Sequence, residues 1–460
     1  MFTIAAVATN VSALPVGTIL DTYGPRVCGL IGSCLLTIGA LFLAFAKQTP
    51  PAFDAYIASL LFLAVGGPFI YISSFHLSNA FPARSGLILS MLTGAFDASS
   101  ALFLVFRVVN QKSGGAFSTQ RFAVVYLLTP LVVVIAQMSI MPARSYKTVG
   151  ELVQQAEAHM ENERGNGGDG HEHRCNENHQ DTVGKIQDFL SFDGSEHEIT
   201  SSVGRNTALL QDTETPTPDQ QQPPLTRNKN NKDPVRGALH GHAALHQILT
   251  PWFLLMTTFS ILQMLRLNYF VASIRRQYEH LLSSPLLARH LNEIFDILLP
   301  LGGILSVPFI GYILDHHSTV FVLAALVSSA TLIGVLGCIP HSLIAGYTNV
   351  VLFVVYRPFY YTAVSDYAAK AFGFGCFGKV YGAMVCAAGL GNFAQAGLDA
   401  LTFKVFEWNP IPVNVALTSV AGVVGGGLVG FVWARARAMA AGNNESVENG
   451  DGEHEPLLRG

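Results

Sequence analysis

The stretch PVGTILDTYGPR, residues 15–26, ends a long apolar run on an aspartate, a glycine and an arginine. Residues 1–20, which include the start of this stretch, contain no charged side chain. A helix of about 20 apolar residues crosses the roughly 30 Å hydrocarbon core of a bilayer, because each residue rises about 1.5 Å. The stretch therefore predicts a membrane helix over 1–20 that ends in a charged turn at Asp21.

The composition of the whole chain points to the same class of protein. Of its 460 residues, 50 % are hydrophobic and only 13 % are charged, whereas soluble domains carry about 25 % charged residues. The length rule predicts eleven membrane segments, at 1–20, 27–46, 54–75, 84–107, 122–142, 248–271, 291–314, 318–338, 343–365, 376–403 and 411–433. The fold class expected is an all-α polytopic membrane protein.

Two polar regions interrupt or follow these segments. Residues 143–247 are rich in Gln, Asn, Glu, His, Gly and Pro, and residues 434–460 are also polar. Such compositions bury too little apolar surface to offset the entropy of ordering. We expect a mostly disordered central loop and a disordered tail.

The first motif returns in the second half of the chain. Gly311 and Asp315 in VPFIGYILDHHS repeat Gly17 and Asp21 at an offset of 294 residues. A second pair, Asp97 in LTGAFDASSALF and Asn392 in AAGLGNFAQAGLDALTF, stands at an offset of 295. Transporters are often built from repeated halves, so we expect two equivalent bundles. The first bundle then lacks its own first helix, either because the sequence is truncated at its start or because the protein has eleven helices.

The pattern G-x-x-x-D-x-x-G-x-R at Gly17, Asp21, Gly24 and Arg26 resembles the signature loop of the major facilitator superfamily. In that family the loop joins the second and third helices on the cytoplasmic side, and GYILDHHS is similar to its degenerate second copy. The resemblance implies a fold of two six-helix bundles with a cytosolic loop and tail. The domains expected are the five-helix bundle 1–142, the loop 143–247, the six-helix bundle 248–433 and the tail 434–460.

The residues of the motif have a physical interpretation. Gly17 lets two helices approach closely, and Asp21 can accept from backbone N–H groups at the start of a neighbouring helix, where the dipole favours an anion. Arg26 can pair with a carboxylate. Together they would form a charged clasp between the halves; an ordinary polar turn is the alternative.

A narrower resemblance lies in residues 81–106 and 377–393. These segments are similar to solute carrier family 43, the system-L-type amino-acid transporters, and to its fungal relatives. The resemblance implies facilitated transport of amino acids. A proton-coupled carrier of other small solutes such as monocarboxylates is one alternative, with Asp97 as the proton site. A non-transporting scaffold or sensor is the other.

Charged side chains inside the apolar segments are candidates for substrate contact or gating, because each costs about 2.5 kcal/mol or more to insert. A zwitterionic amino acid needs one anionic and one cationic partner, which Asp97 with either Arg357 or Arg266 would supply. An aromatic cluster that contains Tyr360 and Tyr361 would receive an apolar side chain. The alternative is a buried ion pair that only ties helices together. The candidates are Asp97, Arg266, Arg357, Tyr360, Tyr361 and Asn392.

Other chemistry has no support in the sequence. No nucleophile elbow, phosphate-binding loop or zinc-protease motif occurs, so we expect no enzyme and no cofactor. The histidines of the central loop fix no coordination geometry, so no metal site is predicted. No basic block points to nucleic acid. The expected partners are a small-molecule substrate, the lipid bilayer and, for a coupled carrier, protons. The acidic dileucine pattern at Glu453, Leu457 and Leu458 favours a vacuolar membrane; the plasma membrane is the other address considered.

Overall fold

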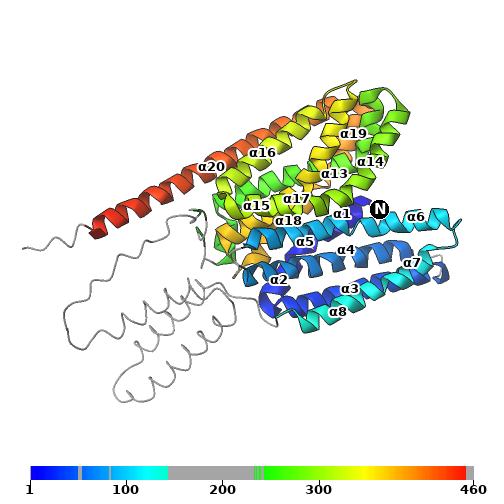
Figure 1. Ribbon diagram of the computed structural model, residues 1–460, viewed down its shortest axis with the longest axis horizontal. Coiled ribbons are helices and arrows are strands. Elements are labelled where there is room, and N and C mark those ends of the chain that lie inside the picture. The colour runs from blue at the N-terminus through cyan, green and yellow to red at the C-terminus, as the bar shows by residue number, and fades with distance from the viewer. Residues whose placement is uncertain are drawn as a thin grey trace, which may run out of the picture. The chain divides into compact units, whose positions relative to one another are not determined.

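The computed structural model describes residues 2–49, 54–81, 84–142, 233, 235, 238–239, 243–373 and 375–451. Within these residues every regular element is a helix (Figure 1). Before the central loop these are α1 (Phe2–Val11), α2 (Ala13–Tyr23), α3 (Pro25–Phe45), α4 (Ala55–Ser74), α5 (Ser85–Ala98), α6 (Ala101–Lys112), α7 (Thr119–Tyr126) and α8 (Leu128–Ser139). After it come α12 (Ala244–Ile248), α13 (Pro251–Leu282), α14 (Pro285–Leu305), α15 (Val307–His316), α16 (Thr319–Leu336), α17 (Leu343–Phe372), α18 (Phe377–Gly391), α19 (Ala394–Ala400) and α20 (Ile411–Asp451).

The predicted all-α membrane fold is confirmed. The described part of the chain has eight helices that are long and apolar enough to cross a bilayer, or nine when the bent pair α14 and α15 counts as one span. The two remaining predicted segments, 1–20 and 376–403, are also helical, but each is divided into shorter helices.

The helix breaks reveal the repeat in three dimensions. The break between α1 and α2 falls at Ser12, and the 43° bend between α14 and α15 falls at Ser306, again 294 residues later. A proline, Pro15 or Pro308, follows each break and lacks the N–H that would continue the helical hydrogen bonds. The helices of the two halves are therefore interrupted at equivalent positions.

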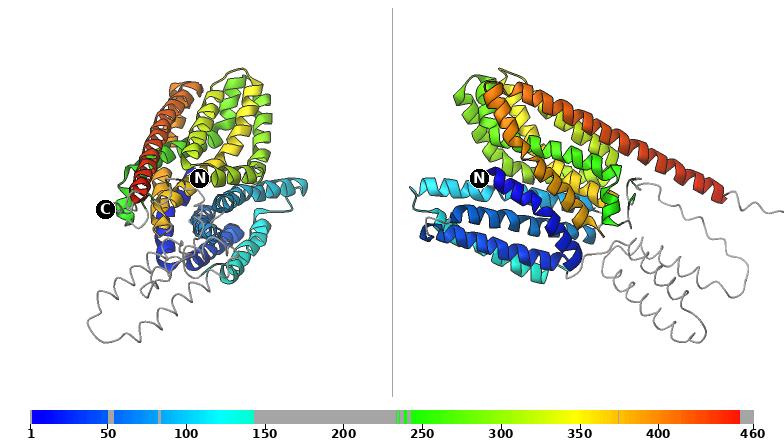
Figure 2. Two further views of the ribbon diagram at one scale, coloured as in Figure 1. Left: turned by 60° about the vertical axis from the view of Figure 1, so that its left-hand side comes forward. Right: turned by 180° about the vertical axis from the view of Figure 1, so that it is seen from behind.

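The halves contact each other through two matching sets of helices. In the N-terminal half α3 packs against α4, α7 and α8, and in the C-terminal half α16 packs against α17 and α20. Between the halves α18 lies against α1 and α2, while α5 lies against α14, α15 and α17. In Figures 1 and 2 the halves approach at the end that carries α2 and α15 and diverge toward the ends of α6 and α19.

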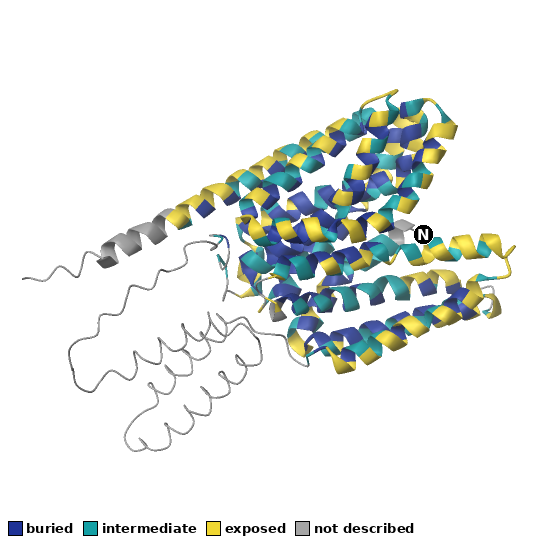
Figure 3. Ribbon diagram, viewed as in Figure 1, coloured by how far each residue is buried: buried dark blue, intermediate teal, exposed yellow. Residues whose placement is uncertain are grey.

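The outer surface of the helices is apolar, as contact with lipid requires. Large hydrophobic side chains are exposed along α8, including Leu131, Val132 and Ile135, and on α20, including Val423. Figure 3 shows buried residues concentrated where α17 and α18 meet the other half. Backbone groups in hydrocarbon need internal partners, and helices supply them.

Two boundaries differ from the sequence-based expectation. Helix α20 continues past residue 433 to Asp451, and the residues that directly follow Trp433 are Ala, Arg and Met, which are good helix formers. The end of the central loop also has structure. Asp233 accepts a hydrogen bond from the backbone N–H of Thr319 at the start of α16 (2.7 Å), and Val235 is fully buried. The rest of the loop before residue 233 lies outside the described residues.

Candidate functional site

The first signature motif brings α2 and α18 together. Both oxygens of Asp21 accept hydrogen bonds from backbone N–H groups in the first turn of α18, from Gly378 and Lys379, at 2.9 Å each. A Cβ atom on Gly17 would lie 1.8 Å from the carbonyl oxygen of Gly378, so the close approach requires glycine. Burial raises the pKa of Asp21 to about 6, against the opposing effect of the two backbone hydrogen bonds and of Lys379. We call this contact the α2–α18 clasp.

The second copy of the motif makes the same kind of contact, with the roles of the two halves exchanged. Asp315 at the end of α15 accepts from the backbone N–H groups of Gly86 (2.8 Å) and Leu87 (3.2 Å) at the start of α5. A Cβ on Gly311 would lie 2.9 Å from the Cα of Leu87. This α15–α5 clasp and the α2–α18 clasp each place a carboxylate at a helix N-terminus, where the unpaired N–H groups favour negative charge.

The other two positions of the motif serve the turn itself. Gly24 has a φ of +85° between α2 and α3, a conformation that favours glycine. Arg26 was expected to pair with a carboxylate, and among the described residues this expectation is wrong. Arg26 instead donates from Nε (3.0 Å) and Nη2 (2.8 Å) to the carbonyl oxygen of Met141, just beyond α8. Carbonyl groups past a helix C-terminus lack helical partners and attract a cation.

Asp97 and Arg357 meet between the two halves. Asp97 lies near the end of α5 and Arg357 in the middle of α17, with 3.3 Å between Oδ1 and Nη1. The Asp97 side chain is 1 % exposed and that of Arg357 20 %. The guanidinium also lies over the ring of Tyr361, 5.9 Å from its centroid. Of the two arginines considered for Asp97, the structure places Arg357 beside it.

Three of the four other candidates lie apart from this pair. Arg266 lies within the C-terminal half and donates to the carbonyl oxygen of Ala330 at 3.0 Å. Tyr360 is buried and donates to the carbonyl oxygen of Ser260 at 3.1 Å. Asn392 is 1 % exposed at the break between α18 and α19, and its amide atoms have no hydrogen-bond partner among the described residues. Only Tyr361 of these four touches the Asp97–Arg357 pair.

A tyrosine that the sequence analysis did not single out completes the surroundings of the pair. The Tyr71 hydroxyl lies 3.2 Å from the Thr93 hydroxyl. The Tyr71 ring contacts Phe96, which in turn contacts Tyr361. A tyrosine inside the apolar segment 54–75 was the available signal, but Tyr56 lies in the same segment and nothing in the sequence separates the two.

No group of three or more metal-ligating side chains occurs among the described residues. The loop histidines weighed as ligands, apart from His246, lie outside the described residues.

Comparison with known proteins establishes the family. A profile of the Major Facilitator Superfamily matches residues 1–396. The chain belongs to the major facilitator superfamily. As a member, it is a multi-pass membrane transporter of small solutes and not an enzyme.

Individual relatives within the superfamily differ in what they carry. Protein FMP42 of Saccharomyces cerevisiae is 44 % identical over 421 residues, which cover 91 % of this chain and 80 % of that protein. Equilibrative nucleobase transporter 1 of Bos taurus is 34 % identical over 117 residues, 24 % of this chain and 22 % of that one. Amino acid transporter 6-1 of Toxoplasma gondii is 31 % identical over 142 residues, 31 % of this chain and 24 % of that one.

Among solved structures, the proton:xylose symporter XylE superposes with a TM-score of 0.56 at 13 % identity. The match covers 93 % of this chain and 84 % of XylE. At this identity the likeness concerns the fold.

Proposed function

We propose that this protein carries amino acids by alternating access and that Asp97 and Arg357 are the charged part of its substrate site. The observation that supports the proposal is the buried ion pair between α5 of one half and α17 of the other. An amino acid at neutral pH carries one ammonium and one carboxylate. Asp97 suits the ammonium, and the planar guanidinium of Arg357 suits the carboxylate.

The energetics of the pair make opening depend on substrate. Removing one partner from a buried ion pair costs about 3–5 kcal/mol, because the other charge stays buried and unpaired. Separating the halves at Asp97 and Arg357 without substrate breaks the same contact, at a smaller cost where water reaches the separated charges. A zwitterion inserted between them gives each side chain a new partner, so substrate binding lowers the penalty.

The two clasps fit the gating part of the same proposal. The α2–α18 and α15–α5 clasps both join helices of opposite halves at the end where the halves approach. Their release on that face would expose the Asp97–Arg357 region to the cytosol. In the present structure both clasps are formed.

The relatives leave two substrate classes to compare. The similarity to an amino acid transporter favours a zwitterion, while that to a nucleobase transporter favours a neutral ring. A neutral nucleobase offers no charge to either Asp97 or Arg357, so the ion pair argues for the amino acid. Two further proposals are proton coupling through Asp97 and residence in the vacuolar rather than the plasma membrane. A pH-independent flux would contradict the proton coupling.

Uptake of radiolabelled leucine into vesicles that contain the purified protein tests the proposal. We expect saturable uptake by the wild type and its loss in Arg357→Ala. Arg289→Ala is the matched control, because Arg289 is exposed and its ion-pair partner is Glu293 on the same helix. Adenine uptake without leucine uptake would contradict the amino-acid assignment.

A charge exchange separates substrate contact from a purely structural role. In the double variant Asp97→Arg with Arg357→Asp, the ion pair can form again in reverse. If the pair only ties helices together, both folding and transport return. If it contacts substrate, the protein folds but leucine uptake stays low, because each charge now faces the wrong helix.

A further inference from the structure

Arg266 is a second buried cation, and it has no ion-pair partner among the described residues. It lies on α13 and donates to three neutral acceptors, namely Gln263 Oε1 (3.4 Å), the Ala330 carbonyl oxygen (3.0 Å) and Thr418 Oγ1 (3.3 Å). Ion pairs among the described residues involve other arginines and Lys370, and none involves Arg266. A guanidinium stays charged in proteins, so a full positive charge lies inside the C-terminal half.

The hydrogen bonds also leave part of the guanidinium free. Arginine has five N–H groups, and the three bonds of Arg266 use one N–H on Nη1 and both on Nη2. The Nε–H and one Nη1–H have no acceptor among the described residues. Unsatisfied charged donors are expensive away from water.

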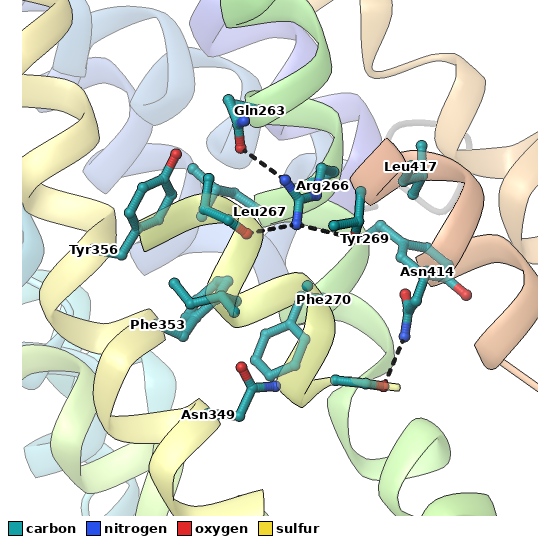
Figure 4. A pocket seen from close by; sticks show the side chains of 15 residues that line it. Gln263, Arg266, Leu267, Tyr269, Phe270, Asn349, Phe353, Tyr356, Asn414 and Leu417 are labelled. Carbon is teal, nitrogen blue, oxygen red and sulfur yellow. Dashed lines mark hydrogen bonds between the residues drawn. The ribbon is translucent and has the colours of Figure 1, made fainter. Parts of the chain in front are cut away.

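A cavity of about 40 Å³ adjoins Arg266 (Figure 4). Its wall also contains Tyr356, whose buried hydroxyl has no hydrogen-bond partner among the described residues. Asn349 contributes an amide oxygen that likewise lacks a partner. The cavity thus combines an unbalanced cation, a free hydroxyl donor and apolar walls such as Phe270 and Phe353.

We propose that this cavity binds one small monovalent anion of the size of chloride, held by Arg266 and the Tyr356 hydroxyl. The anion neutralises the guanidinium and accepts from the free N–H groups and from the hydroxyl. A water molecule in the same cavity donates a hydrogen bond to the amide oxygen of Asn349. The cavity volume suits this occupant, because a single water needs about 10–15 Å³ on the same measure.

The anion site is separate from the proposed substrate site but shares a helix with it. Tyr356 and Arg357 are neighbours on α17, and successive residues of a helix point about 100° apart. Tyr356 lines the cavity inside the C-terminal half, while Arg357 contacts Asp97 of the other half. The proposal stands whether or not amino acids are the substrate.

Thermal unfolding of the purified protein tests the site without relying on transport. Unfolding is followed by tryptophan fluorescence while chloride replaces gluconate at constant ionic strength. Ligand that binds only the folded state raises the Tm with concentration. We expect a saturable rise with chloride and with bromide, and none with gluconate, which is too large for the cavity.

Three variants locate the effect. Arg266→Gln removes the cation and should abolish the chloride-dependent rise, while the exposed Arg289→Gln should keep it. Tyr356→Phe preserves the cavity and the charge, and it should weaken the apparent chloride affinity by about tenfold to a hundredfold, because it removes one hydrogen bond to a charged group. If Arg266→Gln does not fold, Tyr356→Phe decides.

Two results would overturn the proposal. Equal Tm values of the wild type in chloride, bromide and gluconate would mean that the cavity holds water only. A chloride effect that survives unchanged in Tyr356→Phe and in a folded Arg266→Gln would place the anion elsewhere.

Discussion

The Asp97–Arg357 pair permits a quantitative prediction about coupling. Two unit charges 3.3 Å apart interact by about 5 kcal/mol at an effective dielectric constant of about 20. We expect Asp97→Asn and Arg357→Gln each to lower the free energy of unfolding by about 3–5 kcal/mol, because each leaves the other charge buried and unpaired. The double variant leaves no buried charge, so it should lose much less than the sum of the two.

A double-mutant cycle measures this difference directly. The purified variants are unfolded by sodium dodecyl sulfate in mixed micelles and followed by tryptophan fluorescence. We expect a coupling energy of at least about 2 kcal/mol for the buried pair. The exposed pair Arg275–Glu279, with side chains 59 % and 34 % exposed, should give less than about 1 kcal/mol. Additive single effects at Asp97 and Arg357 would refute the reasoning, since they would mean that the two charges do not interact.

Three further predictions concern the α2–α18 clasp and the end of the central loop. Gly17→Ala inserts a methyl group against a backbone carbonyl of α18 and should destabilise the protein in chemical unfolding by about 1–3 kcal/mol. The control Gly67→Ala should be neutral or stabilising, because its added Cβ would have no atom within 4 Å. Equal effects of the two variants would contradict the packing argument. Burial raises the pKa of Asp21 from 3.8 to about 6. The α2–α18 clasp should therefore be most stable below pH 4 and lose stability as the pH rises through 6. The distance between spin labels on α2 and α18 should report this change, and Asp21→Asn should remove the pH dependence. Asp233→Ala removes the hydrogen bond to Thr319 and should cost about 0.5–2 kcal/mol of local stability, seen as faster proteolysis of the end of the central loop, and unchanged proteolysis would count against the contact.

The repeat was the part of the fold that the sequence predicted best. The offset of 294 residues that relates Gly17 to Gly311 also relates the helix breaks at Ser12 and Ser306. A glycine four residues before an aspartate is a short-range pattern, and the backbone contact it makes follows from that pattern. The helix starts that receive Asp21 and Asp315 could not be named, because these pairings join residues more than 200 positions apart.

The candidate site was predicted in its chemistry but not in its pairing. Hydropathy alone singles out Asp97, Arg266 and Arg357 as costly charges in apolar segments. Which arginine faces Asp97 depends on the side of its helix that points to the other half. Arg266 has the same local pattern as Arg357, yet packing turns it into the interior of its own half.

Two errors share a physical cause. Arg26 was expected to find a carboxylate, and its partner is the carbonyl oxygen of Met141. The tail from residue 434 was expected to be disordered, and helix α20 continues into it as far as Asp451. In both cases a property of the backbone determines the structure. For Arg26 it is a carbonyl group without a helical partner, and for α20 it is helix propensity. The prediction considered only side-chain charge and hydropathy.

Leucine counterflow tests the central claim most directly. Vesicles that contain the purified protein are loaded with unlabelled leucine and diluted into a trace of labelled leucine. A carrier that alternates between two faces predicts transient accumulation of label above the outside concentration, with Arg357→Ala showing none and Arg289→Ala behaving as wild type. Accumulation that is the same in vesicles with and without internal leucine, or that Arg357→Ala retains while folded, would contradict the account.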